Sequence, residues 1–194
     1  MTDYRSDVRD ALVGLLTAES ARIITHLAQV AELATQTAIE LDLSPSLVEL
    51  TRLGAEVHDV GKVGIPAKIL EKPGPLDVDE QWFVQRHSEI GESLVQAMPA
   101  LKVVAPIVRA VHERPDGQGY PDGLVGEQIP ISARIIAVVD AFDAMTSDRP
   151  YQRAISEPAA LAELRRHAGS QFDGAVVEAF IRALGDRTSA RHAA

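Results

Sequence analysis

The chain has 194 residues, which is enough for one compact domain with a sizeable core but short of two typical domains. Its formal net charge is −9, so no basic surface predicts binding to duplex nucleic acid, and an anionic ligand would need a local cationic site. The absence of cysteine excludes disulfides, cysteine-ligated zinc and iron–sulfur clusters.

The start of the chain and its hydropathy favour a cytoplasmic protein. The first residues carry charges of both signs and lack the apolar core of a signal peptide. No apolar run approaches the roughly 18 residues of a membrane span. An aromatic content of 4%, with many Ala, Leu and Val residues, favours helices over a β-sandwich. The sequence therefore predicts an all-α protein without a membrane span.

Most of the chain follows the period of amphipathic helices, with apolar residues three and four positions apart. Residues 63–77 and 115–130 do not, because both stretches are rich in glycine, proline and aspartate. The second is long for a loop in a compact domain, and such loops are more often functional than idle. The expected helices span residues 7–16, 20–41, 45–60, 77–98, 101–114, 131–145, 157–167 and 174–184.

These helices form one domain with two short ends. We interpret residues 1–19 as an N-terminal helical cap or the remnant of a linker, and residues 187–194 as a frayed tail. The domain itself covers residues 20–186, where we find no internal repeat and no further boundary.

Histidine and aspartate side chains lie on or beside the apolar stripes of several helices. Taken singly, each has an ordinary explanation: a surface pair at a helix end capped by glycine, a hydrogen-bonded core histidine, or a carboxylate paired with lysine or arginine. Six such residues in one helical domain are hard to satisfy by mutual hydrogen bonds alone. They are His26, His58, Asp59, His87, His112 and Asp140.

This set of imidazoles and carboxylates favours one or two redox-capable or borderline metal ions inside a helical bundle. Asp59 has two carboxylate oxygens and can bridge two ions about 3.5–4 Å apart. The sequence thus predicts a single all-α bundle with a metal site in its interior.

Several motifs make the prediction more specific. Residues 58–62, HDVGK, resemble the HD-x-G-K signature of the HD metal-dependent phosphohydrolases. Residues 112–121, HERPDGQGYP, resemble the HHE-x-x-DG-x-GYP signature of the HD-GYP subfamily, and residues 72–76 and 143–151 match its connecting sequence. The match runs in order over residues 26–180, which is most of the chain.

The resemblance implies an all-α HD-type domain that hydrolyses cyclic di-GMP to pGpG or GMP with iron or manganese ions. Carried over position by position, it implies a catalytic role for Asp59 and Lys62, where Lys62 matches a lysine that contacts the scissile phosphate. It puts the six residues named above at metal-ligand positions, with His26 at the upstream histidine. The residues that it assigns to substrate binding are Gly119, Tyr120, Pro121 and Arg149.

The chain departs from the family pattern at four positions. Val111 replaces a ligand histidine, so one metal would lose a protein ligand. Arg22 replaces an acidic residue of three-metal members, so we expect two ions rather than three. Gln29 replaces a common arginine, and Gln152 replaces a basic residue that helps to hold phosphate, for which Arg153 is the expected substitute.

Three functions therefore stay open. The first is a phosphodiesterase for cyclic di-GMP. The second is a non-catalytic module that binds cyclic di-GMP or a partner protein. Such a partner would be a diguanylate cyclase or another signalling protein, docked on the loop of residues 115–130 that carries the GYP sequence (the GYP loop). A homodimer is also allowed. The third is an HD hydrolase for another nucleotide or phosphate ester.

Overall fold

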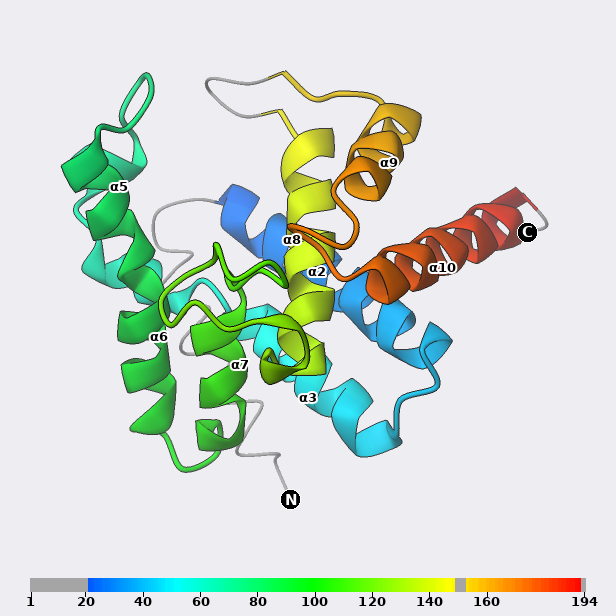
Figure 1. Cartoon of the computed structure of the whole chain (residues 1–194), viewed down its shortest axis with the longest axis horizontal. Helices are drawn as coiled ribbons and strands as arrows, with labels where there is room; N and C mark the ends of the chain where they lie inside the picture. The colour runs from blue at the N-terminus through cyan, green and yellow to red at the C-terminus, as the bar shows by residue number, and fades with distance from the viewer. Residues whose placement is uncertain (1–20, 149–152, 193–194) are drawn as a thin grey trace.

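The computed structural model describes the backbone of residues 21–148 and 153–192 (Figure 1). Within these ranges it contains helices, 3-10 turns and isolated β-bridges but no strand, which confirms the expected all-α class. None of the helices described is both long and apolar enough to cross a membrane. The expected helix over residues 7–16, the N-terminal cap, Arg149 and Gln152 lie outside the described residues.

The elements follow one another in the order shown by the colour gradient of Figure 1. The α-helices are α2 (Ala21–Glu40), α3 (Pro45–Val57), α4 (Ala67–Leu70), α5 (Val78–Gln85), α6 (His87–Gln96), α7 (Ala105–Ala110), α8 (Ile131–Thr146), α9 (Glu157–Arg166) and α10 (Gly174–His192). The 3-10 turns are η1 (Val60–Gly64), η2 (Lys102–Val104) and η3 (Gly126–Gln128).

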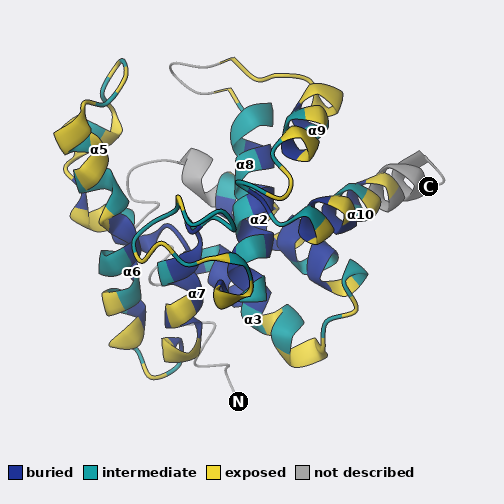
Figure 2. Cartoon of the chain, in the orientation of Figure 1, coloured by how far each residue is buried: buried dark blue, intermediate teal, exposed yellow. Residues whose placement is uncertain are grey.

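Helix α8 is the centre of the bundle. It packs against α2, α3, α7, α9 and α10, and Ile135, Val138 and Val139 on it are fully buried. Figure 2 shows the buried residues concentrated where α2, α3 and α8 meet. The buried side chains belong to the apolar stripes expected from the sequence. Their removal from water provides the main stabilisation of the fold.

Two helix starts follow the signals in the sequence. The hydroxyl of Ser44 accepts the Leu47 amide, and Pro45 occupies the first turn of α3. Asp77 and Glu80 form a capping box at the start of α5.

The prediction of one helix over residues 77–98 is wrong, because the chain breaks at Arg86 into α5 and α6. The imidazole Nδ1 of His87 lies 2.7 Å from the carbonyl oxygen of Val84 and donates to it. That carbonyl belongs to the last turn of α5, where backbone acceptors lack helical partners. Helix α3 likewise ends at Val57, short of residue 60.

Other boundaries also differ. The expected helix over residues 101–114 is divided into η2 and α7, which ends at Ala110. Residues 63–77, expected to be loop, contain the short helix α4. Helix α10 continues to His192, past the end of its apolar stripe. These differences lie at element ends, where local side-chain bonds compete with the helical pattern.

Gly61 brings the turn η1 into backbone contact with α6. A Cβ atom at this position would lie 1.9 Å from the His87 carbonyl oxygen and 2.6 Å from the Gly91 nitrogen. Only glycine permits this approach, which holds residues 58–62 beside His87. The HDVGK motif therefore has a packing requirement as well as a chemical one.

We expect Gly61→Ala to lower the free energy of unfolding by about 3 kcal/mol or more, because neither backbone segment can yield without moving its element. Urea unfolding of the metal-free protein, followed by circular dichroism, measures this effect. Gly174→Ala is the matched control, since its nearest neighbour would be the Ala168 Cβ at 3.8 Å. Equal stability of the two variants would contradict the proposed contact.

Candidate metal centre

The six predicted metal ligands come together as two adjoining groups. The first contains His26, His58 and Asp140, and the second contains Asp59, His87 and His112. In each group, one nitrogen or oxygen from every residue lies within 4.8 Å of the others. No other group of this kind occurs among the described residues. The side chains come from distant parts of the sequence, so the fold itself assembles them.

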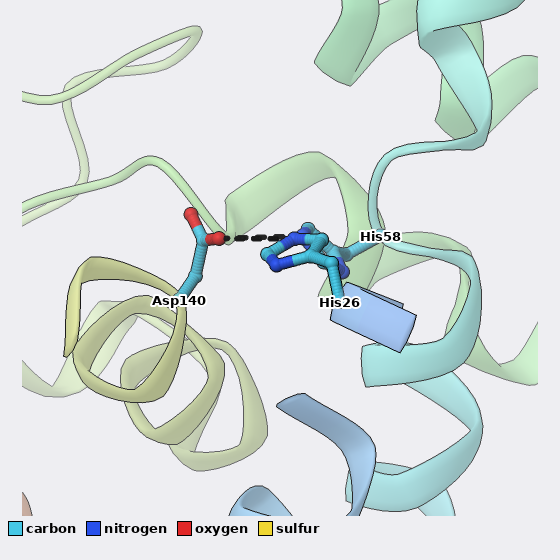
Figure 3. A group of neighbouring side chains, drawn as sticks. All are labelled: His26, His58 and Asp140. Atoms are coloured by element: carbon cyan, nitrogen blue, oxygen red, sulfur yellow. Dashed lines mark ion pairs between the residues drawn. The ribbon is translucent and has the colours of Figure 1, made fainter. Parts of the chain in front are cut away.

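In the first group, α2, the end of α3 and α8 each supply one side chain. The Nε2 atom of His26 lies 3.4 Å from Oδ1 of Asp140, and that of His58 lies 3.9 Å from the same oxygen. Figure 3 shows Asp140 reaching from α8 toward the two imidazoles. Two nitrogens and an oxygen therefore converge on one point.

The second group adjoins the first through its own member Asp59. The Nε2 atoms of His87 and His112 are 2.9 Å apart, and Nε2 of His87 lies 3.7 Å from Oδ1 of Asp59. The other oxygen of this carboxylate, Oδ2, lies 3.6 Å from Nε2 of His58. The two oxygens of Asp59 thus face different groups, as a carboxylate that bridges two ions requires.

Helix ends aim two of the four imidazoles. Nδ1 of His58 donates to the Ala55 carbonyl at 2.7 Å, and Nδ1 of His87 donates to the Val84 carbonyl at 2.7 Å. Each acceptor belongs to the last turn of a helix, where carbonyl groups lack intrahelical partners. Because Nδ1 is the donor in both rings, it is Nε2 of each ring that faces the cluster.

Two buried atoms of the cluster fit a metal ion. His58 Nε2 and Asp59 Oδ1 have no hydrogen-bond partner among the described residues, although both residues are buried. A buried polar atom without a partner is costly, and a cation would satisfy both of these acceptors. Imidazole and carboxylate donors without thiolate suit manganese, iron or zinc better than calcium or magnesium.

The charges also favour ligand chemistry. Burial alone would raise the pKa of the Asp59 carboxyl, but the ammonium group of Lys62, which also donates a hydrogen bond to it, holds that pKa well below its ordinary value. Burial and the neighbouring His87 lower the pKa of His112 to about 3, and burial likewise lowers the pKa of His87. The carboxylate is therefore ionised and these imidazoles are neutral near pH 7, which are the forms that bind metal.

Lys62 lies at the edge of the cluster. Its Nζ donates to Oδ2 of Asp59 at 2.5 Å, while the side chain keeps 39% of its surface exposed. The turn η1 spaces the two residues three positions apart and so holds the ammonium group beside the carboxylate. An anionic group that approached the cluster from solvent would meet this positive charge.

A family model described as HD domain matches residues 10–176. The chain belongs to the HD domain family. The resemblance that the sequence motifs indicated is thereby confirmed, and the His58–Asp59 dipeptide of the predicted HD motif lies at the junction of the two groups.

Two curated relatives and one solved structure illustrate the similarity. The chain is 44% identical over 158 residues to the cyclic di-GMP phosphodiesterase response regulator RpfG of Xanthomonas campestris pv. campestris, which covers 80% of this chain and 42% of the relative. It is 37% identical over 183 residues to the 3′3′-cGAMP-specific phosphodiesterase 2 of Vibrio cholerae, covering 92% of this chain and 35% of the relative.

The HD domain thus spans less than half the length of these two relatives. Its fold resembles that of Bd1817, a HDG"Y"P protein from Bdellovibrio bacteriovorus, with a TM-score of 0.69 and 20% sequence identity. That alignment covers 84% of this chain and 52% of the Bdellovibrio chain. At this identity the likeness concerns the fold alone.

The loop of residues 115–130 folds back over the second group of this HD domain. The ring of Tyr120 stacks on His112 with 5.1 Å between centroids and 16° between planes, and its amide donates to the His112 carbonyl. Pro121 follows through a cis peptide bond. A Cβ atom at Gly119 would lie 2.5 Å from the Glu113 Cα, so glycine is required for this close return of the chain.

The two arginines predicted to bind substrate, Arg149 and Arg153, have no described contact with the cluster. Arg149 lies outside the described residues. Arg153 is exposed, and in the part of the chain that the structure describes it makes no ion pair or hydrogen bond with either group. Its assignment to substrate phosphate stays a prediction.

Two buried carboxylates support the site but were not assigned a role from the sequence. Glu113 accepts the backbone amides of Asp122 and Leu124, and Asp143 accepts Nδ1–H of His26 at 2.6 Å. A signal existed for each: Glu113 adjoins His112 within the GYP motif, and Asp143 follows Asp140 by one helical turn. Neither signal identifies the partner, because the partners are distant in sequence or belong to the backbone.

We expect Glu113→Gln to loosen the loop over His112. The amide retains one acceptor oxygen but loses the charge and turns a donor toward the second backbone N–H, at a cost of about 1.5–3 kcal/mol. Amide hydrogen exchange at Asp122 and Leu124 should accelerate by roughly tenfold or more.

Glu163→Gln is the control, since Glu163 pairs with Arg166 and His167 and accepts neither of the two loop amides. Unchanged protection of both loop amides in Glu113→Gln would show that the carboxylate does not hold this segment.

Proposed function

We propose that this HD domain is a metal-dependent phosphodiesterase that hydrolyses cyclic di-GMP to pGpG or GMP. The observation that supports it most strongly is the arrangement around Asp59, whose two oxygens face two separate groups of ligand atoms. The ammonium group of Lys62 beside it suits an anionic diester. The relatives named for cyclic di-GMP and cGAMP support a cyclic dinucleotide as the substrate class.

The proposed cofactors are two divalent ions, iron or manganese. His26, His58 and Asp140 would hold one, His87 and His112 the other, and Asp59 would bridge them. When bound, such ions supply Lewis acidity toward phosphate oxygens. They also lower the pKa of a bound water, so that it ionises near neutral pH. The pair of neutral imidazoles and the ionised bridging carboxylate are in the protonation states that this role requires.

The remaining residues would act on the substrate. Lys62 would stabilise the negative charge that grows on the non-bridging phosphate oxygens, as a cation fixed by its neighbour Asp59. Burial raises the pKa of Tyr120, so its hydroxyl stays protonated and can donate to a phosphate or a base. Gly119 and Pro121 would shape the loop around the ligand, and Arg149 and Arg153 would contact its phosphates.

A second candidate is a module that binds cyclic di-GMP or a signalling protein such as a diguanylate cyclase without turnover. Val111 supports it, because this residue is buried beside His112 and offers no ligand atom to the second group. The exposed surface of the GYP loop would then carry the contact, in one copy or in a homodimer. Product analysis with cyclic di-GMP, 3′3′-cGAMP and a simple phosphodiester separates these candidates.

We expect Asp59→Ala to abolish metal uptake and hydrolysis together, because both groups lose their shared carboxylate. Lys62→Ala should retain both metals but lower turnover on the order of 100-fold, the loss typical of one positioned electrostatic donor. Metal content after dialysis and the rate of pGpG formation under saturating substrate measure the two effects.

Lys102→Ala serves as the control, since Lys102 is an exposed lysine of η2 outside the cluster. If Lys62→Ala turned over as fast as this control, Lys62 would have no part in the reaction. If the unmodified, metal-loaded protein bound cyclic di-GMP without cleaving it, the binding module would replace the enzyme as the better proposal.

The valine at position 111 predicts two unequal metal sites. We expect one tightly held ion and one weaker ion on the side of His87 and His112, so that activity rises with added Mn²⁺ or Fe²⁺. Val111→His should tighten the weaker site, at a cost of about 1–3 kcal/mol in the metal-free state if the new imidazole is buried without a partner.

Val111→Leu controls for size without adding a ligand. A metal titration of the three proteins, followed by turnover at limiting metal, provides the measurement. Two ions that survive extensive dialysis in the unmodified protein, with no change in Val111→His, would show that Val111 does not weaken the site.

A further inference from the structure

We propose that Asp143 is a positioning residue for His26 and makes the group of His26, His58 and Asp140 the tighter of the two metal sites. This inference rests on the metal dependence of the proposed function and adds a residue that the motifs did not assign. It concerns metal affinity and does not require any particular substrate.

His26 differs from His58 and His87 in its place on the fold. The latter two lie at helix ends and use a free carbonyl of the last turn to fix Nδ1. His26 lies inside α2, where the backbone carbonyls are used by the helix itself. Its Nδ1 therefore needs an acceptor from another element.

Asp143 on α8 is that acceptor. Its Oδ2 lies 2.6 Å from Nδ1 of His26, and the residue keeps only 7% of its surface exposed. Asp140 precedes it by one turn, so the same face of α8 supplies both a ligand oxygen and the group that orients a ligand nitrogen. With Nδ1 occupied, Nε2 of His26 points to Asp140 at 3.4 Å.

The charge of Asp143 has no permanent counterpart among the side chains that the structure describes. Its ion pair is with His26, and no lysine or arginine nitrogen of the described side chains lies within 4.0 Å of its carboxylate. A buried carboxylate is costly unless a positive charge compensates it. A divalent ion on Nε2 would provide that charge through the imidazole, in the manner of carboxylate–histidine–metal arrangements.

The second group has no equivalent device among the described residues. His87 is backed by a neutral carbonyl, and His112 stacks on the Tyr120 ring. The first group therefore has Asp140 as a ligand and Asp143 behind His26, whereas the carboxylate of the second group is Asp59, which also faces the first group. A carboxylate makes its histidine a stronger donor than a carbonyl does, so the first group should bind metal more tightly.

The test is a Mn²⁺ titration of the metal-stripped full chain by calorimetry, without substrate. We expect Asp143→Asn to weaken the tighter site about 10–100-fold and leave the weaker site unchanged, because asparagine retains an acceptor oxygen but no charge. Asp173→Asn is the matched control, since it removes the ion pair between Asp173 and Arg134. Arg134 lies on α8, as Asp143 does.

A double-mutant cycle with His26→Gln distinguishes positioning from a structural role. Once His26 is absent, Asp143→Asn should no longer change Mn²⁺ affinity, whereas a structural defect would persist. The inference fails if Asp143→Asn lowers the melting temperature but leaves both dissociation constants as they are. It also fails if the weakening persists in the His26→Gln background.

The outcomes separate this inference from the proposed function. If cyclic di-GMP is not hydrolysed and Asp143→Asn still weakens Mn²⁺ binding, the inference is supported while the proposed enzyme fails. If the enzyme is active and its metal affinities do not respond to Asp143→Asn, the proposed function stands and the inference fails. A protein that takes up no Mn²⁺ at all overturns both.

Discussion

The buried carboxylate of Asp59 is the constraint on which the rest of the structure depends. It is only 6% exposed, its Oδ2 is bound by Lys62, and its Oδ1 has no hydrogen-bond partner in the described part of the chain. Such a charge is tolerated when cations and polar groups surround it. The contact of η1 with α6 at Gly61 satisfies this requirement, because it carries the carboxylate to His87 and keeps Lys62 at the edge.

The bundle aims its imidazoles in two different ways. At the ends of α3 and α5, a histidine caps a carbonyl of the last turn, so that the interruption of the helix also fixes the ring. Within the continuous helix α2, the same task falls to a carboxylate on α8. The first arrangement requires the helix to end beside the histidine, and the second requires a carboxylate to be buried. Their use in one site explains why its helices are partly broken and partly uninterrupted.

The sequence predicted the fold class and the six clustered side chains because both depend on helical stripes and on the order of motifs. It failed at Arg86, since Phe83, His87 and Ile90 continue one stripe across the break and periodicity cannot detect a bond from an imidazole to a carbonyl. It also missed the partner of His26, because Asp143 lies 117 positions away. Only tertiary structure brings these two residues together.

The inequality of the two groups has a consequence for where a substrate would bind. The first group draws its side chains from α2, the end of α3 and α8, and Asp143 supports its His26, whereas the second group shares Asp59 with the first and lies beside Val111. Catalytic metal sites keep a coordination position open, while structural sites close it with protein ligands. The loop that carries Tyr120 covers His112, on the side of the poorer group. If the proposed function and the predicted inequality of the two sites both hold, Val111 would leave metal binding weaker at the place where a diester oxygen would complete the coordination, and metal occupancy would then depend on the presence of substrate.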